Sequence, residues 1–324
     1  FKYVNDQGGV HGRSIELKII DDQLKPYKAK EELEELTLKN DIFAVFSGIG
    51  SKTHQAVYPL LKQQRLPSFF VGSDLPEWTQ PIRANVFGFM PTAETEARVI
   101  GKYITEKHTG KEFIIWYPEK PVYQRAVKVL TKELYSVSAK LLPGKAGRLS
   151  AEWQLIRKNN PDFLVVLGNY TDVMNFLKFS PQINIPMLTG HALADSRLPE
   201  WLGQKVSERV RVLTAYPLKI ETEHPGQILH KLILSEYAPK LALNRWTLYG
   251  HAVAELMVEV LNRTGRFLSR QKAVSAAESI TNWQGKLLPP VYLDSRNHLA
   301  LTTFRVSRIT YGRVSHLSGW IDGK

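Results

Sequence analysis

The feature that most constrains the fold is a regular alternation of short apolar runs with longer stretches of helical periodicity. The run FLVVLG at 163–168 has no polar side chain, so a strand formed there must be buried on both faces. Such strands belong to parallel sheets covered by helices, and the alternation predicts an open, doubly wound α/β architecture. The predicted strands are 15–21, 43–48, 68–72, 113–117, 163–168, 185–189 and pieces of 291–315; the predicted helices are 26–39, 52–64, 95–108, 122–135, 153–158 and 172–179, with a nearly all-helical stretch at 225–283.

The length of the chain favours two lobes, because 324 residues would be large for one open sheet. No low-complexity linker divides the sequence, but extended, proline-marked pieces occur at 89–91, 215–217 and 288–290. Three crossings imply that the lobes interleave in sequence. We therefore predict that lobe 1 comprises 1–91 and 217–290 and that lobe 2 comprises 92–216 and 291–324.

The composition and the motifs exclude several kinds of chemistry. The absence of cysteine excludes disulfides, thiolate metal sites and a cysteine nucleophile. The formal net charge is +12, but the basic residues are scattered among acidic ones, which argues against a nucleic-acid partner. The nine histidines lack zinc spacings, and no GxSxG elbow or dinucleotide fingerprint is present. We expect no metal, no cofactor and no enzymatic activity.

The stretch NDQGGVHGRSIELKIIDDQ, residues 5–23, combines three glycines with a predicted strand and two aspartates. A phosphate-binding glycine loop follows a strand and opens a helix, whereas here a strand follows the glycines. Neighbouring residues on a strand point to opposite faces, so Asp21 and Asp22 cannot share one small site. We expect these acids to hydrogen-bond the adjoining turn.

Two strand ends carry candidate ligand contacts. GIGSKTH, residues 48–54, places glycines and hydroxyls between a strand and a helix N-terminus, an arrangement that receives anions. Ser51 or Thr53 either only caps this helix or also touches a ligand. His191, in LTGHALADS, follows another strand, where ligands of α/β sheets bind, but it also fits a loop histidine with satisfied hydrogen bonds.

The order of these pieces resembles one protein family along nearly the whole chain, more weakly after about Arg266. The matching pieces are the N-x-x-GG-x-x-GR turn, the strand ending in two aspartates, the P-x-x-A helix, GIGSKTHQAV, LPSFFVGS, TEA at 95–97 and NNPDFLVV at 159–166. Together they are similar to the branched-chain amino-acid-type periplasmic binding proteins, the substrate-binding subunits of ABC importers. The resemblance implies the type I two-lobed fold, in which each lobe is a mainly parallel sheet flanked by helices and three segments form the hinge.

The same resemblance implies a function. We expect an extracytoplasmic solute-binding protein that captures a small ligand in the interlobe cleft by hinge closure and docks on an ABC permease. We expect a monomer that is periplasmic, or extracellular and membrane-tethered. The alternative is a ligand-sensing domain of the same fold in a receptor or transcriptional regulator. Family members carry a first strand and most of a helix ahead of the glycine motif, and residues 1–4 match the tail of that helix.

The resemblance also implies the residues of the ligand site. A carboxylate-holding loop, a second loop of the same lobe, an aromatic of the other lobe and two later strand-end loops contribute, together with the start of a helix. In that order they are Ile49, Gly50, Ser51 and Thr53; Gly72, Ser73 and Asp74; Tyr123; Asn169 and Tyr170; His191; and Trp246 or the adjacent Arg245.

Two departures from the family bear on the ligand. Amino-acid binders usually have a serine at the position of Gly50 and an acid, which pairs with the α-ammonium, at that of His191. A buried ammonium without a partner costs several kcal/mol. Unless Asp74 substitutes, we expect a carboxylate-bearing or aromatic or aliphatic compound rather than an ordinary amino acid, with Tyr123, Tyr170 and Trp246 as apolar walls.

Overall fold

The computed structural model describes residues 1–39, 42–145, 147–179 and 184–324, and it confirms the α/β class with parallel sheets flanked by helices. The chain forms two compact units: unit 1 comprises Phe1–Pro91 and Ile228–Leu301, and unit 2 comprises Thr92–Gln227 and Thr302–Lys324. The sequence prediction placed the second and third crossings at 216/217 and 290/291. Within the described ranges, no helix combines the length and the apolar character that a bilayer crossing requires.

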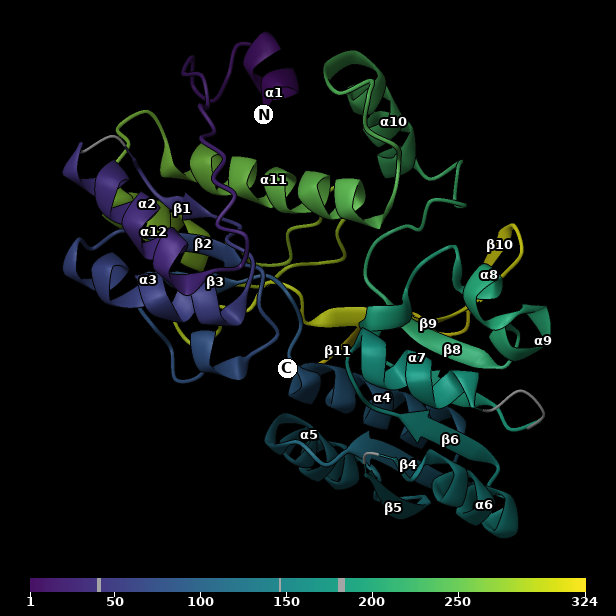
Figure 1. The fold of residues 1–324 in the computed structure, drawn as a ribbon. Helices are drawn as coiled ribbons and strands as arrows, with labels where there is room; N and C mark the ends of the chain where they lie inside the picture. The colour runs from purple at the N-terminus through teal and green to yellow at the C-terminus, as the bar shows by residue number, and fades with distance from the viewer. Residues whose placement is uncertain (40–41, 146, 180–183) are drawn as a thin grey trace. The chain divides into compact units, whose positions relative to one another are not determined.

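Unit 1 is built on a three-stranded parallel sheet of order β1-β2-β3, and Figure 1 shows its helices around these strands. Pro26 stands in the first turn of α2, where its missing N–H costs nothing, and Leu33 of α2 packs on Val57 and Leu61 of α3. The elements of the unit are α1 (Lys2–Asp6), α2 (Pro26–Leu38), β1 (Val45–Phe46), α3 (Ser51–Gln63), β2 (Ser68–Val71), η1 (Pro76–Trp78), β3 (Val86–Gly88), α11 (Arg245–Thr264) and α12 (Arg270–Glu278), while α10 (Pro225–Tyr237) begins in unit 2 and ends in unit 1.

The glycine motif forms a tight turn after α1, as the sequence predicts. Asn5 fixes the chain beyond the turn, since its side chain accepts from the Ile15 N–H (2.8 Å) and donates to the Ile15 carbonyl (2.9 Å). Gly9 has φ +70°, and a Cβ there would lie 2.2 Å from the Arg13 carbonyl oxygen, so only glycine fits. The turn therefore has a structural role.

The strand predicted at 15–21 is wrong. This segment pairs with no described strand, and Ile19 is 85% exposed. A strand is defined by a partner whose backbone it bonds, so an apolar sequence without that partner stays unassigned. The prediction for the acids that follow is confirmed: Asp21 accepts from the Gln23 N–H (2.9 Å) and Asp22 from the Leu24 N–H (2.7 Å).

Unit 2 contains an eight-stranded sheet. Seven of its strands follow one another in the order β10-β9-β8-β7-β6-β4-β5, and the eighth, β11, pairs with β9. The strands β8, β7, β6, β4 and β5 are parallel, and β9 is antiparallel to β8. Its elements are α4 (Ala93–Lys107), β4 (Glu112–Pro118), α5 (Pro121–Glu133), β5 (Ser138–Gly144), α6 (Leu149–Asn159), β6 (Phe163–Val166), α7 (Tyr170–Lys178), β7 (Met187–Thr189), η2 (His191–Leu193), α8 (Leu198–Leu202), α9 (Gln204–Ser207), β8 (Val210–Thr214), β9 (Thr303–Thr310), β10 (Arg313–His316) and β11 (Ile321–Asp322).

Both faces of the unit 2 sheet are covered. Ile114 and Trp116 of β4 pack in one core with Trp153 of α6 and Phe176 of α7. Successive strand residues point to opposite faces, so the fully buried Ile115 faces the other side. There α4 and α5 pack together (Figure 1). This two-sided burial explains the uninterrupted apolar strand that the sequence shows at 163–168.

Candidate functional site

The first candidate site in unit 1 lies where β1 and β2 end. An isolated parallel bridge joins Ile49 to Gly72, the Gly72 N–H donates to the Gly48 carbonyl (2.9 Å), and the Gly50 N–H donates to the Gly72 carbonyl (3.3 Å). These bonds hold the two strand-end loops side by side. The structure thus brings together two segments that the sequence analysis assigned to one site, residues 49–53 and residues 72–74.

Two hydroxyl groups meet across these loops. Ser51 Oγ lies 2.6 Å from Ser73 Oγ, and Ser73 Oγ also accepts from the Leu75 N–H at 3.3 Å. Ser73 is only 7% exposed, so its position is fixed by packing. Each hydroxyl can rotate its proton outward, and the pair can donate to a carboxylate oxygen placed beside it.

The helix α3 begins at this corner without a side-chain cap. Its N-cap is Gly50, and no side chain of the described residues accepts from the first-turn N–H groups. Thr53 turns its hydroxyl the other way, donating to the carbonyls of Gly50 (2.9 Å) and Ile49 (3.0 Å). The interpretation that Ser51 or Thr53 caps the helix is therefore wrong. Uncapped N–H groups and the positive end of the helix dipole make this corner receptive to an anion.

Tyr249, on α11, supports the same corner and was missed by the sequence analysis. Its hydroxyl lies 3.0 Å from Ser47 Oγ, and burial raises the pKa of the phenol. A Cβ at Gly72 would lie 3.1 Å from this hydroxyl and 3.0 Å from the Ile49 side chain. Tyr249 thus explains why the second loop has a glycine at 72. It lies far away in the sequence, and no local motif marks it.

The remaining candidates of unit 1 are more exposed. Asp74 follows Ser73 in the same loop, is exposed and makes no hydrogen bond or ion pair with another described residue. Trp246 is 59% exposed at the start of α11, where the Asn244 side chain accepts from its N–H at 2.8 Å. The Arg245 guanidinium carbon lies 5.1 Å from the Trp246 ring centroid, within range of a cation–π interaction. The side chains of Asp74 and Trp246 are therefore both accessible for contact with a ligand.

The candidates of unit 2 follow three neighbouring parallel strands. Tyr123 comes after β4, Asn169 and Tyr170 after β6, and His191 after β7, and β6 pairs with both β4 and β7. Their loops therefore share the carboxyl edge of the sheet, where α/β proteins bind ligands. Tyr123 is buried in the first turn of α5.

Asn169 and Tyr170 have contacts of their own in unit 2. Asn169 caps α7, because its side chain accepts from the Asp172 N–H at 2.9 Å. The Tyr170 ring is 42% exposed and packs edge-on against Trp201, with the centroids 5.5 Å apart. Of the four candidates of unit 2, only Tyr170 has a side chain that combines exposure with an apolar surface.

His191 is a buried histidine, 3% exposed, with both ring nitrogens near oxygen atoms. Nε2 lies 3.2 Å from the Tyr216 hydroxyl and Nδ1 lies 3.4 Å from the Leu213 carbonyl. The main-chain N–H of His191 donates to Glu96 Oε1 at 2.7 Å. These contacts favour the interpretation of His191 as a loop histidine whose hydrogen bonds are satisfied within unit 2.

Glu96 is the functional candidate that the sequence analysis missed in unit 2. It lies in the first turn of α4, and an added Cβ at Gly190 would come within 2.2 Å of its Oε2. The carboxylate of Glu96, on α4, thus lies beside Gly190 and His191. The sequence analysis had found no acid in the loop that contains these two residues. The TEA motif at 95–97 contained the residue, but its contact with a loop 95 positions away required the fold.

One hydrogen-bonded chain in unit 2 has the residue types of a catalytic triad. Ser307 Oγ lies 2.9 Å from His316 Nδ1, and His316 Nε2 lies 3.1 Å from Glu221 Oε1. Ser307 is fully buried, and its hydroxyl also lies 2.6 Å from the Thr214 hydroxyl. A nucleophile must reach its substrate, so this chain is a cross-strand network that holds β8, β9 and β10 together.

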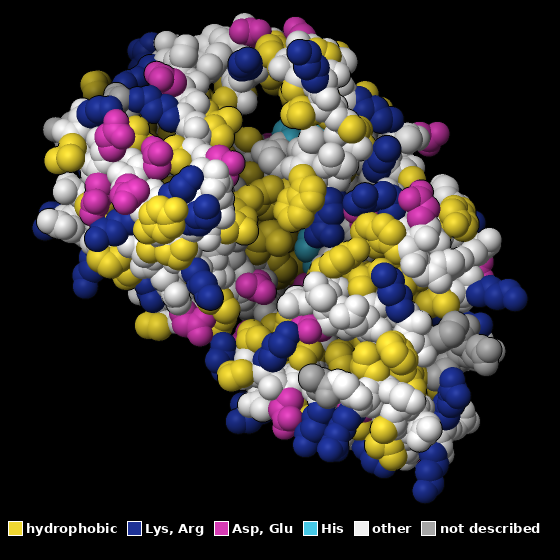
Figure 2. Space-filling view, viewed as in Figure 1, with side chains coloured by type: hydrophobic (Ala, Val, Ile, Leu, Met, Phe, Trp, Pro, Cys, Tyr) yellow, Lys and Arg dark blue, Asp and Glu magenta, His cyan; other side chains and the backbone are white. Residues whose placement is uncertain are grey.

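The charged surface side chains are mixed in sign. Figure 2 shows Lys and Arg side chains dispersed over the visible face, with Asp and Glu among them. Among the described residues, no group of three or more His, Asp or Glu side chains has the arrangement of a metal site. The corner of β1, β2 and α3 can therefore bind an anion through hydrogen bonds.

Comparison with known proteins places the chain in a family. The sequence profile of the periplasmic binding protein family matches residues 1–313. None of the curated proteins matches. Solved structures with the same fold include a branched-chain amino acid ABC transporter from Thermus thermophilus with bound valine, at 16% identity, a TM-score of 0.77 and coverage of 99% of this chain and 89% of the other.

Two further structures show the same fold. A putative branched-chain amino acid ABC transporter from Rhodospirillum rubrum has 14% identity, a TM-score of 0.78 and coverage of 98% and 91%. A fatty acid ABC transporter substrate-binding protein from Thermomonospora curvata has 18% identity, a TM-score of 0.73 and coverage of 99% and 85%. The chain belongs to the periplasmic binding protein family, which confirms the family predicted from the sequence.

Proposed function

We propose that this chain is the extracytoplasmic solute-binding protein of an ABC importer and that its ligand is a small organic carboxylate. The observation that carries the proposal is the corner of unit 1, where the uncapped N-terminus of α3 adjoins the hydroxyl pair of Ser51 and Ser73. Backbone N–H groups and neutral hydroxyls stabilise a carboxylate without requiring a buried cation. Family membership supports the transport role.

The rest of the ligand is expected to meet unit 2. Tyr170 and, in unit 1, Trp246 offer exposed aromatic surface, which favours an aliphatic or aromatic body on the carboxylate. The sequence-based preference for a ligand without an ammonium group rested on the lack of an acid near His191. Glu96 supplies one there, so amino acids belong to the class to be tested together with acids that lack the amine. We expect hinge closure on binding and docking on a permease.

A thermal-shift screen tests this function. The probes are L-valine, L-leucine, 3-methylbutanoate, phenylacetate and octanoate, each as the sodium salt. A ligand at 100 times its Kd stabilises the folded state by about 2.7 kcal/mol, which raises Tm measurably. The best probe is then examined by small-angle scattering, where we expect a smaller radius of gyration when it is bound. Chemical turnover of a probe, or no shift with any carboxylate, would overturn the proposed function.

A further inference from the structure

One stretch of unit 2, residues 120–160, has exposed charges of a single sign. It contains α5, the edge strand β5 and α6. Within its described part, every exposed charged side chain is basic: Lys120, Arg125, Lys128, Lys132, Lys140, Lys145, Arg148, Arg157 and Lys158. Figure 2 shows Lys and Arg side chains around α5 and β5, at the lower end of the view, with hydrophobic ones between them. We call this surface the basic edge.

The two acidic residues of this stretch are engaged within unit 2. Glu152 is buried, and its carboxylate accepts from Trp116 Nε1 at 2.7 Å and from the Lys145 N–H at 2.8 Å. Glu133 Oε1 lies 3.6 Å from Nε of Arg98, on α4. Neither carboxylate is placed to neutralise the exposed basic side chains around it.

Seven of the nine basic side chains have no acidic partner in the described part of the chain. Lys120 Nζ lies 2.8 Å from the Asp172 carboxylate and Arg125 Nε lies 2.9 Å from that of Glu94, whereas the other seven form no ion pair with a described residue. Like charges gathered on one surface repel one another, and a partner of opposite charge relieves that repulsion. The basic edge is therefore complementary to an extended anionic surface.

The basic edge is continuous around β5. On one face of the sheet, Lys140 Nζ donates to Asn159 Oδ1 at 2.9 Å, and Asn159 Nδ2 donates to the Leu155 carbonyl at 2.7 Å, which joins β5 to α6. Leu141, the next residue of β5, points to the opposite face. It is in register with Ile115 of β4, which faces α4 and α5. The surface therefore extends from α6 across the strand to α5.

Exposed apolar side chains lie among these cations. Tyr135 is 84% exposed, Leu141 42% and Leu155 48%. Lysine on an edge strand protects the strand from pairing with another chain, and this role explains Lys140. It does not explain basic residues on two helices or the apolar side chains between them. Lysine and arginine interleaved with leucine and aromatic residues are typical of surfaces that lie in the interfacial layer of a membrane.

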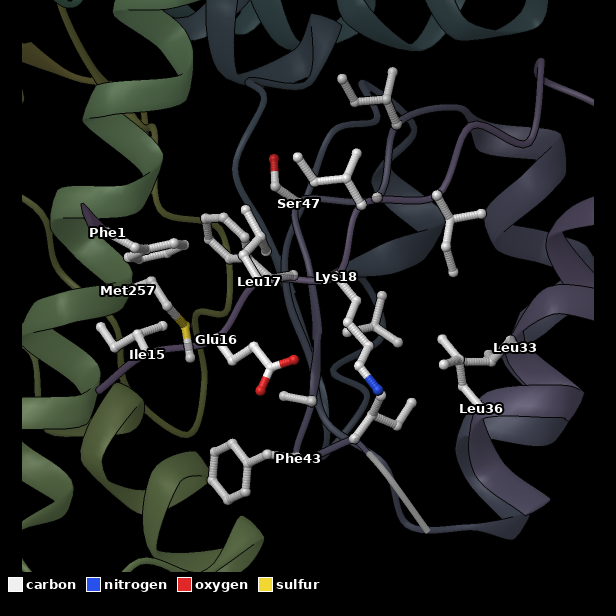
Figure 3. A pocket seen from close by; sticks show the side chains of 18 of the residues that line it. Phe1, Ile15, Glu16, Leu17, Lys18, Leu33, Leu36, Phe43, Ser47 and Met257 are labelled. Atoms are coloured by element: carbon white, nitrogen blue, oxygen red, sulfur yellow. The ribbon is translucent and has the colours of Figure 1, made fainter. Parts of the chain in front are cut away.

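Exposed apolar side chains of unit 1 have a different setting. Leu17 and Ile20 line a cavity of about 890 Å³, which Leu33 of α2 and Met257 of α11 also border (Figure 3). Their partial exposure is therefore explained by an internal hollow. The three apolar side chains of the basic edge lie instead on an outer surface, beside exposed cations.

We propose that the basic edge binds the head groups of an anionic phospholipid bilayer, with Tyr135, Leu141 and Leu155 entering the interfacial layer. Phosphate head groups attract Lys and Arg side chains near the bilayer surface, and the apolar side chains add buried area. A soluble acidic polymer would match the charges but would leave the apolar side chains without a partner. The inference rests on the proposed function, because an extracytoplasmic solute-binding protein works beside the membrane that holds its permease.

Vesicle co-sedimentation of the full chain, without any small carboxylate, tests the proposal. One set of vesicles is phosphatidylcholine alone, and the other contains about 30% phosphatidylglycerol. We expect the partition coefficient to be at least about tenfold higher for the anionic vesicles at low salt, and the difference to disappear at about 0.5 M NaCl, because salt screens the attraction. Equal binding to both sets of vesicles, or no binding to either, would overturn the proposal.

A matched pair of triple variants locates the surface. Lys132→Gln, Lys140→Gln and Lys158→Gln together should lower the partition coefficient for anionic vesicles by at least about tenfold. The control removes three exposed charges near β8, β9 and β10, on the other side of the sheet, and so has the same net charge; it combines Lys205→Gln, Lys219→Gln and Arg313→Gln. Equal losses in the two proteins would mean that binding follows net charge, which would overturn the assignment to the basic edge.

A second pair of variants distinguishes a lipid surface from a soluble polyanion. Tyr135→Ser combined with Leu155→Ser should lower the partition coefficient for anionic vesicles by at least about threefold and leave the Kd for poly-L-glutamate unchanged. Tyr27→Ser with Leu241→Ser is the control, because these side chains are exposed in unit 1 (57% and 58%). Vesicle binding that is unchanged in the Tyr135 and Leu155 variant would assign the surface to a soluble polyanion and overturn the proposal.

The outcome is separable from that of the carboxylate screen. A protein that shifts its Tm with a carboxylate but does not sediment with anionic vesicles would overturn the lipid surface and keep the proposed function. A protein that sediments through the basic edge but responds to no carboxylate would overturn the proposed function and keep the surface. Circular dichroism checks that each variant is folded before either measurement.

Discussion

Ser51 Oγ lies 2.6 Å from Ser73 Oγ, although the two residues are 22 positions apart: Ser51 opens α3 after β1, and Ser73 lies in the loop after β2. The contact exists because β1 and β2 are parallel neighbours, so their carboxyl ends meet at one edge of the sheet. The hydroxyl pair adjoins the uncapped start of α3. The carboxylate site we propose depends on this relationship.

Removing either hydroxyl should weaken binding more than it weakens the fold. For Ser51→Ala and Ser73→Ala we expect the Kd for the best carboxylate probe to rise by roughly tenfold each, and the free energy of unfolding to change by about 1 kcal/mol or less. Isothermal titration calorimetry and urea unfolding measure the two effects. Ser235→Ala is the control, because Ser235 is exposed on α10 and, among the described residues, its hydroxyl donates only to the Leu232 carbonyl. Equal effects of Ser51→Ala and Ser235→Ala on Kd would exclude Ser51 from the site.

Two glycines of unit 1 should respond in opposite directions to alanine. Gly50 has φ +107°, and a Cβ there would lie 2.7 Å from Thr53 Oγ1, so Gly50→Ala should cost roughly 1–3 kcal/mol and disturb the start of α3. Gly250 lies inside α11 with no atom within 4 Å of an added Cβ, so Gly250→Ala should stabilise by about 0.5–1 kcal/mol. Tm and urea midpoints measure both. Stabilisation by Gly50→Ala would contradict the described geometry of this corner.

Local chemistry and periodicity predicted the helices of this chain well. The helix expected at 26–39 is α2 (Pro26–Leu38), because a proline at its start and apolar spacing of three and four residues act within the segment itself. The strand expected at 15–21 failed because its existence depends on a neighbouring backbone that sequence pattern does not report. The edge strand β5 (Ser138–Gly144) was missed because it pairs only with β4 and is half exposed, so no continuous apolar run marks it.

The residues of the candidate site also divide into those that the sequence analysis named and those that it missed. Ser51 was a candidate because it follows a predicted strand, whereas Ser73 was named from the family resemblance; parallel topology explains why their hydroxyls lie together, since it brings strand ends to one edge of the sheet. Tyr249 and Glu96 were missed because their contacts with Ser47 and His191 join segments that lie far apart in the sequence. Such contacts depend on helix packing against the sheet, which periodicity predicts as a burial pattern and not as pairs of residues.

Glu96 provides a test of whether the ligand has an ammonium group. Glu96→Gln keeps an oxygen that can accept from the His191 N–H but removes the negative charge. If the Glu96 carboxylate pairs with the ammonium group of a ligand, the Kd of the variant for L-valine should rise at least about tenfold. The Kd for 3-methylbutanoate, which lacks only the amine, should stay the same. Glu94→Gln is the matched control. Glu94 lies two positions earlier on α4, and its Oε1 accepts a hydrogen bond from Arg125 Nε at 2.9 Å. A similar rise in Kd for both ligands would mean that Glu96 has only a structural role.

His54 should make the stability of unit 1 depend on pH. Its side chain is buried against Trp78, with ring centroids 4.3 Å apart, and burial, with the nearby Arg83 charge, lowers its pKa to about 4 from an ordinary value of 6.5. Between these two values the unfolded chain binds more protons than the folded chain, so the free energy of unfolding rises with pH there and falls as pH drops. From pH 7 to pH 5 the loss due to His54 should be about 2 kcal/mol.

The variant His54→Phe isolates this contribution. Phenylalanine keeps an aromatic ring against Trp78, and it removes the titrating group, whose Nε2 is buried without a hydrogen-bond partner in the described part of the chain. Urea unfolding at pH 7 and pH 5 should show the variant losing about 2 kcal/mol less than the natural chain. Some dependence should remain, because burial also lowers the pKa of His230 and of His251 to about 4. An unchanged difference between the two pH values would mean that the pKa of His54 is the same in the folded and the unfolded chain, contrary to its apolar surroundings.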